Sequence, residues 1–248
     1  MSGTAEHIVT GLAEKLGFSI IPTWRLESRE LAQHLAKVFK HYAITTVFDV
    51  GANVGQYHDF LRQQVGFAGQ IHSFEPQPHL AAALKERQTG DRSWVVHNLG
   101  LGSSNGELTL NVMARDTFSS FRQPVADGAG SFSASNTVVD SVVVPVCRLD
   151  DLFPPALMSG QSCYLKVDTQ GFDLEVLLGA PELLKTTRAL QFELAIQRLY
   201  ADVPHYREML ERVENMGFRI SGLFPISMDE GLRAVEFDCV MVRAADTN

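Results

Sequence analysis

The segment from Thr46 to Gln56, TVFDVGANVGQ, constrains the fold of this chain more than any other stretch. It begins with a short run of apolar, β-forming residues, which is typical of a strand covered on both faces. Gly51 and Gly55 follow, and without a Cβ they allow the backbone to turn tightly and to lie against a ligand. The segment therefore predicts a buried strand, a glycine-rich turn and the start of a helix, the unit from which α/β folds are built.

The spacing of the glycines indicates which ligand the turn binds. A dinucleotide fingerprint has glycine at its first, third and sixth positions, but counted from Gly51 the third and sixth are Asn53 and Gln56. A phosphate-binding loop is excluded too, because no Gly-Lys-Ser/Thr follows. The remaining common pattern is a strand-end acid, here Asp49, followed by G-x-N-x-G up to Gly55, and it resembles the S-adenosylmethionine (SAM) site of class I methyltransferases. The residues predicted to bind the cofactor are Asp49, Gly51, Asn53, Gly55 and Gln56. The alternative is an ordinary strand-to-helix turn.

Polar residues at the ends of the next two expected strands fit the same site. Glu75 ends the segment QIHSFE and lies 24 residues beyond Gly51, close to the roughly 20-residue offset of a ribose-binding acid. Asn98 follows the expected strand 93–97, and its amide can both donate to and accept from the edge of an adenine ring. We predict that Glu75 binds the ribose, whereas an adenine contact and a turn-forming role both remain open for Asn98.

Composition and charge exclude several classes of protein. With 45% hydrophobic and 20% charged residues, the chain is neither disordered nor fibrous. The formal charge of −8 argues against broad attraction to nucleic acid or to anionic membranes. The three cysteines are far apart with no zinc-site spacing. No apolar run is long enough for a membrane span, and no N-terminal apolar core with a basic flank indicates a signal peptide. We therefore expect a cytoplasmic protein with free thiols.

Helical periodicity precedes the glycine turn, and a β-rich segment interrupts the later alternation of strands and helices. Helices are predicted over residues 6–16 and 28–42, where they cover the core, close over the cofactor or pair with another subunit. Strands are predicted over 107–113 and 137–146. The polar loop 114–136 between them is long enough to be a substrate lid or a flexible insertion.

The final third of the chain returns to the α/β rhythm. Its predicted elements are a strand at 188–194, a helix at 204–216, a strand at 218–224, a loop at 225–233 and a last strand at 235–243. No linker or internal repeat divides the chain, so residues 1–248 are expected to form a single domain.

Motifs that occur in order along the chain resemble the FkbM family of methyltransferases. They are VFDVGANVGQ at 47–56, FEP at 74–76, CRLDDLF at 147–153, LKVDTQGFDLEVLLGA at 165–180 and FEL at 192–194. The resemblance implies a class I methyltransferase fold: a doubly wound, Rossmann-like, mostly parallel seven-stranded sheet with an antiparallel last strand, which carries the β-rich insertion. It also implies a catalytic core over 44–243, with Pro76 beside the cofactor. Residues 1–43 fall outside the resemblance, and their helical periodicity predicts an N-terminal helical cap.

One departure from the family pattern lies in the second glycine turn. The commoner version is D-x-E-G-x-E, whereas Gln170 and Asp173 fill the two acidic places here. Gln170 cannot act as a base, so any role of a carboxylate at this turn falls to Asp168, to Asp173 or to a neighbour.

Asp168 and Glu193 are the predicted catalytic residues. They end two expected strands, and ligands of an open α/β sheet bind beyond the carboxyl ends of its strands. Asp168 is expected to accept the proton of a hydroxyl or to orient that hydroxyl, with Glu193 as its partner. Together with Asp173 they could supply oxygen ligands for a divalent cation such as Mg²⁺, and the sequence leaves open whether a metal is bound.

These features predict a SAM-dependent enzyme that methylates a hydroxyl oxygen. The resemblance implies a sugar, glycan or polyketide-type acceptor, which suits an acidic chain better than a polyanion such as nucleic acid does. N-methylation, protein methylation and a regulatory module that binds SAM without catalysis stay open, as does a homo-oligomer formed through the N-terminal helices. A nucleotide-dependent oxidoreductase is disfavoured by Asn53 and Gln56.

Overall fold

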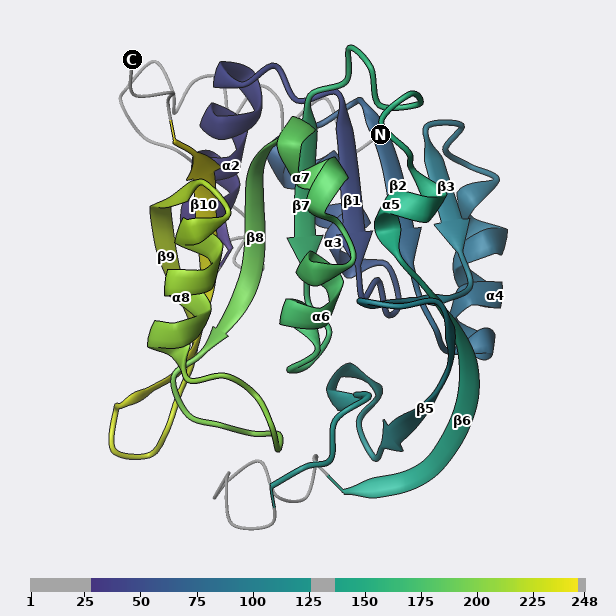
Figure 1. The fold of residues 1–248 in the computed structure, drawn as a ribbon, viewed down its shortest axis with the longest axis vertical. Coiled ribbons are helices and arrows are strands. Elements are labelled where there is room, and N and C mark those ends of the chain that lie inside the picture. Colours follow the sequence, from purple (N-terminus) through teal and green to yellow (C-terminus); the bar gives the residue numbers. More distant parts are fainter. Residues whose placement is uncertain (1–27, 126–136, 245–248) are drawn as a thin grey trace, which may run out of the picture.

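The computed structural model describes residues 28–125 and 137–244. Their central feature is a seven-stranded sheet (Figure 1), whose strands in spatial order are β3 (Trp94–His97), β2 (Gln70–Phe74), β1 (Thr46–Val50), β7 (Cys163–Val167), β8 (Thr187–Ala195), β10 (Ala234–Arg243) and β9 (Phe218–Met228). Strand β10 runs antiparallel to both of its neighbours, whereas the other four pairs are parallel. The predicted mostly parallel sheet with an antiparallel last strand is confirmed.

Helices cover both faces of this sheet (Figure 1). One face carries α2 (Arg29–His41), α3 (Gln56–Phe60), the π-helix Leu61–Val65 and α4 (Pro78–Gln88). The other carries α5 (Leu149–Leu152), α6 (Asp173–Leu178), α7 (Pro181–Thr186) and α8 (Tyr206–Asn215). Because side chains alternate along a strand, Val47 packs in the first layer and Phe48 in the second, and each layer has its own hydrophobic core.

The predicted β-rich insertion forms a second sheet. Its strands in spatial order are β4 (Gly100–Leu101), β6 (Val138–Cys147) and β5 (Gly106–Met113), and the short 3-10 helix Asp116–Phe118 follows β5 in the chain. Figure 1 shows β5 and β6 curving away beyond the carboxyl ends of β1 and β7. The insertion therefore stands over the edge at which an α/β sheet binds its ligands.

The structure differs from the sequence expectation in the length of β9. The sequence predicts a loop from Pro225, but β9 continues to Met228. Pro225 fits because β9 is an edge strand, where one side of the backbone makes no ladder hydrogen bond. The predicted helix 28–42 is α2, whereas the predicted helix 6–16 and the part of the loop 114–136 beyond residue 125 lie outside the described residues.

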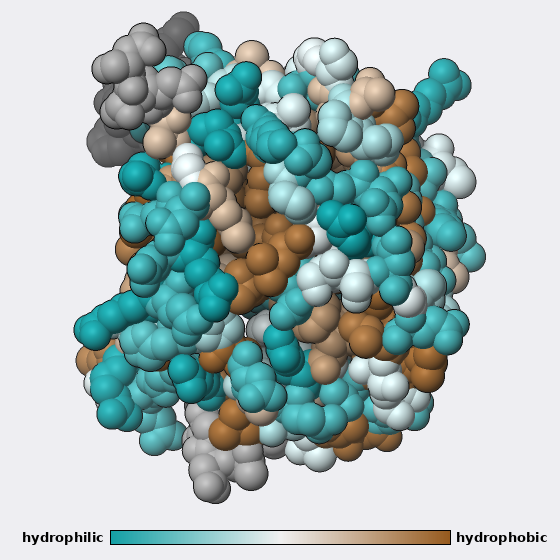
Figure 2. Space-filling view, viewed as in Figure 1, coloured by the Kyte–Doolittle hydropathy of each residue, from teal (hydrophilic) through white to brown (hydrophobic). Residues whose placement is uncertain are grey.

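The surface in this view is mainly hydrophilic, with hydrophobic residues gathered near its centre (Figure 2). The edge strand β9 exposes large apolar side chains at Ile220, Leu223, Ile226 and Met228. Among the described residues, no helix is long and apolar enough to cross a membrane.

Candidate active site

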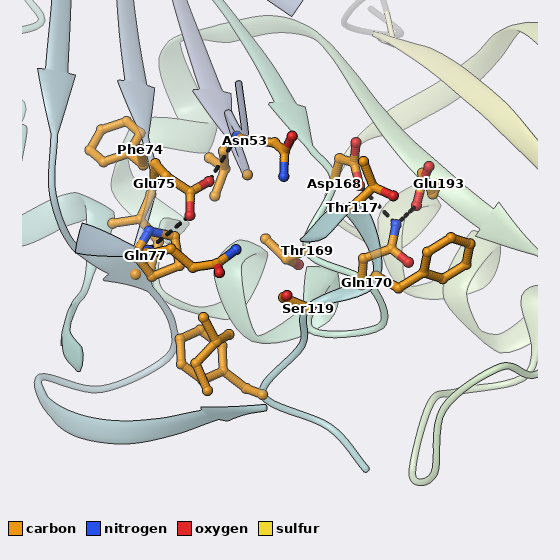
Figure 3. A pocket seen from close by; sticks show the side chains of 18 of the residues that line it. Asn53, Phe74, Glu75, Gln77, Thr117, Ser119, Asp168, Thr169, Gln170 and Glu193 are labelled. Atoms are coloured by element: carbon orange, nitrogen blue, oxygen red, sulfur yellow. Dashed lines mark hydrogen bonds between the residues drawn. The ribbon is translucent and has the colours of Figure 1, made fainter. Parts of the chain in front are cut away.

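A cavity of about 450 Å³ lies at the carboxyl ends of β1, β2, β7 and β8. Its walls come from these strand ends, from the loop after β5 and from the adjoining parts of β9 and β10. Acidic side chains lie at opposite ends of it, with Glu75 at one end and Asp168 and Glu193 at the other (Figure 3). The structure thus brings these three predicted site residues to one cavity.

Backbone donors hold the carboxylate of Glu75. Its two oxygens accept hydrogen bonds from the N–H groups of Asn53 and Gln77, both at 2.8 Å (Figure 3). Glu75 is 3% exposed, and burial raises the pKa of its carboxyl to about 7, although the two hydrogen bonds oppose that shift. Each carboxylate oxygen has a second lone pair, so Glu75 can still accept hydrogen bonds from the hydroxyls of a ligand.

Three residues of the glycine turn after β1 have positive φ angles. Gly51 has a φ of +80°, and a Cβ there would lie 1.8 Å from the backbone oxygen of Asp168. Asn53, with a φ of +47°, and Gly55, with a φ of +84°, continue the left-handed backbone. Gly51, Asn53 and Gln56 line the cavity, whereas a Cβ on Gly55 would meet side chains of α4 instead.

Asp49 lies inside the sheet and not in the cavity wall. It is completely buried, its Oδ2 accepts a hydrogen bond from the Ser73 hydroxyl at 2.9 Å, and its Oδ1 lies 3.2 Å from Nζ of Lys166. The same Nζ lies 3.3 Å from Oδ2 of Asp168 and donates to the backbone oxygen of Gly51 at 3.3 Å. Burial alone would lower the pKa of Lys166, but the carboxylates of Asp168 and Asp49 outweigh it and raise that pKa. Lys166 therefore links Asp49 to the turn and to Asp168.

Asn98 also lies behind the cavity. Its amide donates to the backbone oxygens of Glu75 at 3.0 Å and Pro76 at 3.1 Å, which is a turn-stabilising contact. Pro76 and Gln77 line the cavity and Asn98 does not. Oε1 of Gln77 is buried and has no hydrogen-bond partner within the described part of the chain. The sequence did not single out Gln77, because it follows the strand-end acid and does not itself end a strand.

Gln170 joins the two predicted catalytic carboxylates. Its Nε2 donates to Oδ1 of Asp168 at 3.1 Å and to Oε2 of Glu193 at 2.7 Å (Figure 3). Oδ2 of Asp168 is paired with Lys166, so both oxygens of this carboxylate have a partner. Asp168 and Glu193 therefore meet in one site as the sequence predicts, and Gln170, which the sequence presents only as the absence of a base, connects them.

Three acids around Asp168 have raised pKa values. Burial raises the pKa of the Glu193 carboxyl well above its ordinary value, and the charge of Asp168 adds to the shift. Burial and Asp168 likewise raise the pKa of Glu236, which also lines the cavity, to about 7. The pKa of Asp173 rises to about 7 for the same two reasons. Carboxyl groups that titrate near neutral pH are well matched to accepting a proton during a reaction.

The acids are not arranged as a metal site. Oδ1 of Asp173 accepts from the backbone N–H of Thr169 at 3.2 Å and from its hydroxyl at 3.3 Å. The amide of Gln170 stands between Asp168 and Glu193. Across residues 28–125 and 137–244, no group of three or more His, Cys, Asp or Glu side chains could hold a metal ion. The Mg²⁺ ligand set considered from the sequence is therefore not supported.

The CRLDDLF motif has a structural role at another helix. The carboxylate of Asp150 is buried and accepts hydrogen bonds from the N–H groups of Glu182 at 2.9 Å and Leu183 at 2.8 Å. These are the first N–H groups of α7, which have no partner inside the helix. Arg148 lies 3.7 Å from the same carboxylate. This motif therefore anchors α7 and does not form the cavity.

The strand order, the glycine turn after β1 and the acid at the end of β2 together define a class I methyltransferase that uses SAM. The Methyltransferase FkbM domain matches residues 49–220. This chain belongs to the FkbM methyltransferase family.

Solved methyltransferase structures are similar to this chain at low sequence identity. An rRNA methylase from Streptococcus thermophilus has 11% identity and a TM-score of 0.48, with 92% of this chain and 100% of that chain covered. A putative O-methyltransferase from Klebsiella pneumoniae has 12% identity and a TM-score of 0.45, with 96% and 89% covered. The 1,6-didemethyltoxoflavin-N1-methyltransferase from Burkholderia thailandensis has 11% identity and a TM-score of 0.44, with 99% and 92% covered. Likenesses this distant do not identify an acceptor, and among curated proteins none matches this sequence.

Proposed function

We propose that this methyltransferase transfers the methyl group of SAM to a hydroxyl oxygen of a sugar, a glycan or a polyketide-type small molecule. The observation that carries the proposal is the pair Asp168 and Glu193, joined by Gln170, at the end of the cavity opposite Glu75. A hydroxyl is a poor nucleophile until its proton is removed, and a carboxylate within hydrogen-bond reach can remove it. An acceptor bound at this end of the cavity meets such carboxylates.

The opposite end of the cavity fits the cofactor. We assign the ribose to Glu75, the methionine part to Gly51, Asn53 and Gln56, and the adenine to Pro76 and Gln77. Three observations support this assignment: Gly51, Asn53 and Gln56 line the cavity, Glu75 has remaining lone pairs, and Oε1 of Gln77 has no hydrogen-bond partner among the described residues. SAM, when bound, supplies a methyl group on a sulfonium, and the electron pair of the broken S–C bond stays on sulfur.

Asp168 is the proposed proton acceptor and Glu193 its partner. Lys166 and Gln170 each pair with one oxygen of Asp168, so the direction of this carboxylate is fixed before an acceptor binds. As the new O–C bond forms, the hydroxyl proton passes to the Asp168 carboxylate. Glu193 and Glu236, with their raised pKa values, can then share that proton.

The alternative functions are N-methylation, protein methylation and regulatory binding of SAM, and none of them needs a carboxylate to remove a hydroxyl proton. An amine, as in N-methylation or protein methylation, attacks through its lone pair once it is neutral, and a regulatory SAM-binding module needs no paired acids in the wall. The pair Asp168 and Glu193 supports a hydroxyl acceptor over both. The acidic wall and the formal charge of −8 support a neutral acceptor over nucleic acid.

The cellular location and the assembly of the protein are part of the same proposal. We propose a cytoplasmic enzyme that forms a homo-oligomer through its N-terminal segment, where the sequence predicts helices over 6–16 and 28–42. The mass of the purified protein in solution tests the second point, because a mass equal to that of one chain would contradict it.

Thermal unfolding in the presence of ligands tests the cofactor assignment. SAM and S-adenosylhomocysteine (SAH) are expected to raise the unfolding midpoint and NAD is not, because a ligand that binds only the native state stabilises it. No shift with SAM or SAH, in folded protein stripped of ligand, would contradict the assignment. Sugars, polyketide hydroxyls and amines are then screened with radiolabelled SAM, with Mg²⁺ or with EDTA. Transfer to amines alone would contradict a hydroxyl acceptor.

A further inference from the structure

Gln170 is the residue at which the acidic end of the cavity is held together. Besides its hydrogen bonds to Asp168 and Glu193, its backbone oxygen accepts from the Ser120 hydroxyl at 2.6 Å, and its Oε1 accepts from the Tyr200 hydroxyl at 2.9 Å. Its φ is +52°, in the left-handed region that residues other than glycine adopt rarely. A costly backbone conformation is thus maintained at a residue where four separate parts of the chain meet.

The chemistry of a neutral amide makes this arrangement possible. The two N–H bonds of Nε2 can be donated at the same time, so an oxygen of Asp168 and an oxygen of Glu193 can both accept, whether Glu193 is ionised or protonated. An ionised carboxylate at position 170 would have nothing to donate, and it would add a negative charge beside Asp168 and Glu193. A cationic side chain would donate but would also compensate the charge that makes Asp168 a base. The geometry therefore requires a donor that is neutral.

The oxygen of the same amide connects to the wall against which an acceptor lies. The Tyr200 hydroxyl is 2.9 Å from Oε1 of Gln170 and 2.8 Å from the backbone oxygen of Phe118. Phe118 and Ser119 line the cavity, and Tyr200 is 3% exposed, so this connection is shielded from solvent. The Gln170 side chain, together with the Tyr200 hydroxyl, therefore connects the carboxylates to the loop after β5.

Gln170 also separates the cavity from a smaller one. The second cavity, of about 30 Å³, is lined by Gln170, Glu193 and Glu236 on one side and by apolar residues of the α8 side on the other. The same three residues line the main cavity. A volume of this size accommodates about one or two water molecules. The Gln170 side chain is therefore part of the wall that the two cavities share.

We propose that Gln170 is a positioning residue for methyl transfer: its neutral amide holds Asp168 and Glu193 in the orientation that receives the proton of the acceptor, and it ties them to the cavity wall after β5. This inference rests on the proposed function. Gln170 acts through Asp168 and is not itself a catalytic residue. The other titratable groups around the pair are Lys166, Asp173, Tyr200, Glu236 and Asp238.

Two substitutions at this position separate the donor role from the charge. Gln170→Ala removes the donated hydrogen bonds without adding charge, and Gln170→Glu keeps the size of the side chain but adds an acid. The control is Gln161→Glu, because Oε1 of Gln161 only accepts from Thr45 and Thr46 near the amino end of β7, a role that a carboxylate retains. The first measurement is the titration of the carboxyl groups in SAH-saturated protein between about pH 5 and pH 9. Infrared difference spectroscopy monitors this titration.

Losing donors to an ionised carboxylate disfavours the ionised form. We therefore expect the titration midpoint of the carboxyl cluster to rise by about one unit in Gln170→Ala, to rise further in Gln170→Glu, and to stay unchanged in Gln161→Glu. Unchanged midpoints in both variants at 170 would overturn the inference. If Gln170→Ala fails to unfold cooperatively, Gln170→Glu, which preserves the volume, decides the question.

Turnover with the best acceptor from the hydroxyl screen is the second measurement. Misplaced carboxylates are expected to lower kcat at least about 10-fold in both variants at 170, with KM for SAM within about threefold of the wild type. In Gln170→Glu the acidic limb of the kcat profile is also expected to move to higher pH. A fall in kcat shared by Gln161→Glu would overturn a specific role of Gln170. If the wild type does not bind SAH, the proposed function fails, and titration without ligand still decides whether the amide holds the carboxylates.

Discussion

The two ends of the cavity hold their carboxylates by different means. At one end, the oxygens of Glu75 accept from backbone N–H groups of the glycine turn and of Gln77. At the other, Asp168 and Glu193 are held by the side chains of Lys166 and Gln170. Backbone donors are available from any residue but proline, whereas a particular side chain is lost in a single substitution. The cofactor end therefore depends on the path of the chain, and the acidic end depends on which residues stand at two positions.

Of the substitutions that compare the two ends of the cavity, the one that removes the charge of Asp168 is expected to have the largest effect, which is a loss of kcat. Asp168→Asn keeps the shape but no longer accepts a proton, and positioned general bases contribute about 10²- to 10⁴-fold to rate. We expect kcat to fall by that factor while the Kd for SAH, measured by calorimetry, changes less than about threefold. The control is Asp151→Asn at an exposed position of α5, which should leave both unchanged. Nearly full activity in Asp168→Asn would contradict the proposal that Asp168 is the base at the acidic end.

Lys166 is the point at which the supports of the two ends meet, so its loss should affect the whole fold. Lys166→Met leaves the carboxyl of Asp49 in a site with no exposure and removes the ion pair that its Oδ1 makes at 3.2 Å. Breaking a buried ion pair on one side typically costs about 3–5 kcal/mol, and we expect that loss in the free energy of unfolding. Lys185→Met, which removes an exposed pair with Glu182, should cost less than about 1 kcal/mol. Equal losses in denaturant titrations would contradict the role of Lys166.

Glu75 makes the cofactor end sensitive to pH in the opposite sense to an ordinary surface acid. Its pKa is about 7 in the folded chain against an ordinary value of 4.5, so between these values the folded state binds more protons than the unfolded state. Its contribution to stability is therefore largest below pH 4.5 and is lost as the pH rises to about 7. Glu75→Gln should flatten the dependence of the unfolding free energy on pH by up to about 1.4 kcal/mol per unit in this window. If the slope of the unfolding free energy against pH were the same in Glu75→Gln and in the exposed control Glu182→Gln, this role of Glu75 would be contradicted.

The sequence predicts the frame of the molecule well because the frame is determined by local pattern. The strand and glycine turn after Thr46, the parallel sheet and the β-rich insertion follow from apolar runs, glycine positions and the order of motifs. The extension of β9 through Pro225 escapes this approach, since a proline is compatible with a strand only at an edge, and edge position is a property of the assembled sheet.

The direction of polar side chains is the part that the sequence does not provide. Asp49 ends a strand in the expected place, yet it points into the sheet toward Lys166, which is distant in sequence and becomes its neighbour only when β1 pairs with β7. Lys166 itself offers a signal, because a lysine inside a buried apolar strand needs a charge partner. Gln170 is visible as a departure from the family pattern, but its bridging role depends on the approach of Glu193 from β8.

The smallest expected effects are those of removing the side-chain amides of Gln77 and Asn98 at the cofactor end. Gln77 lines the cavity with a buried oxygen that has no partner in the described chain, whereas Asn98 uses its amide on the backbone of Glu75 and Pro76. A single hydrogen bond to a ligand contributes about 1 kcal/mol, so Gln77→Ala should weaken SAH binding about five- to tenfold. Asn98→Ala should lower the free energy of unfolding by about 1 kcal/mol and change SAH affinity less. Calorimetry and denaturant titration on both variants give the answer. The reverse result would return the adenine contact to Asn98, and the cofactor end would then depend on a side chain as the acidic end does.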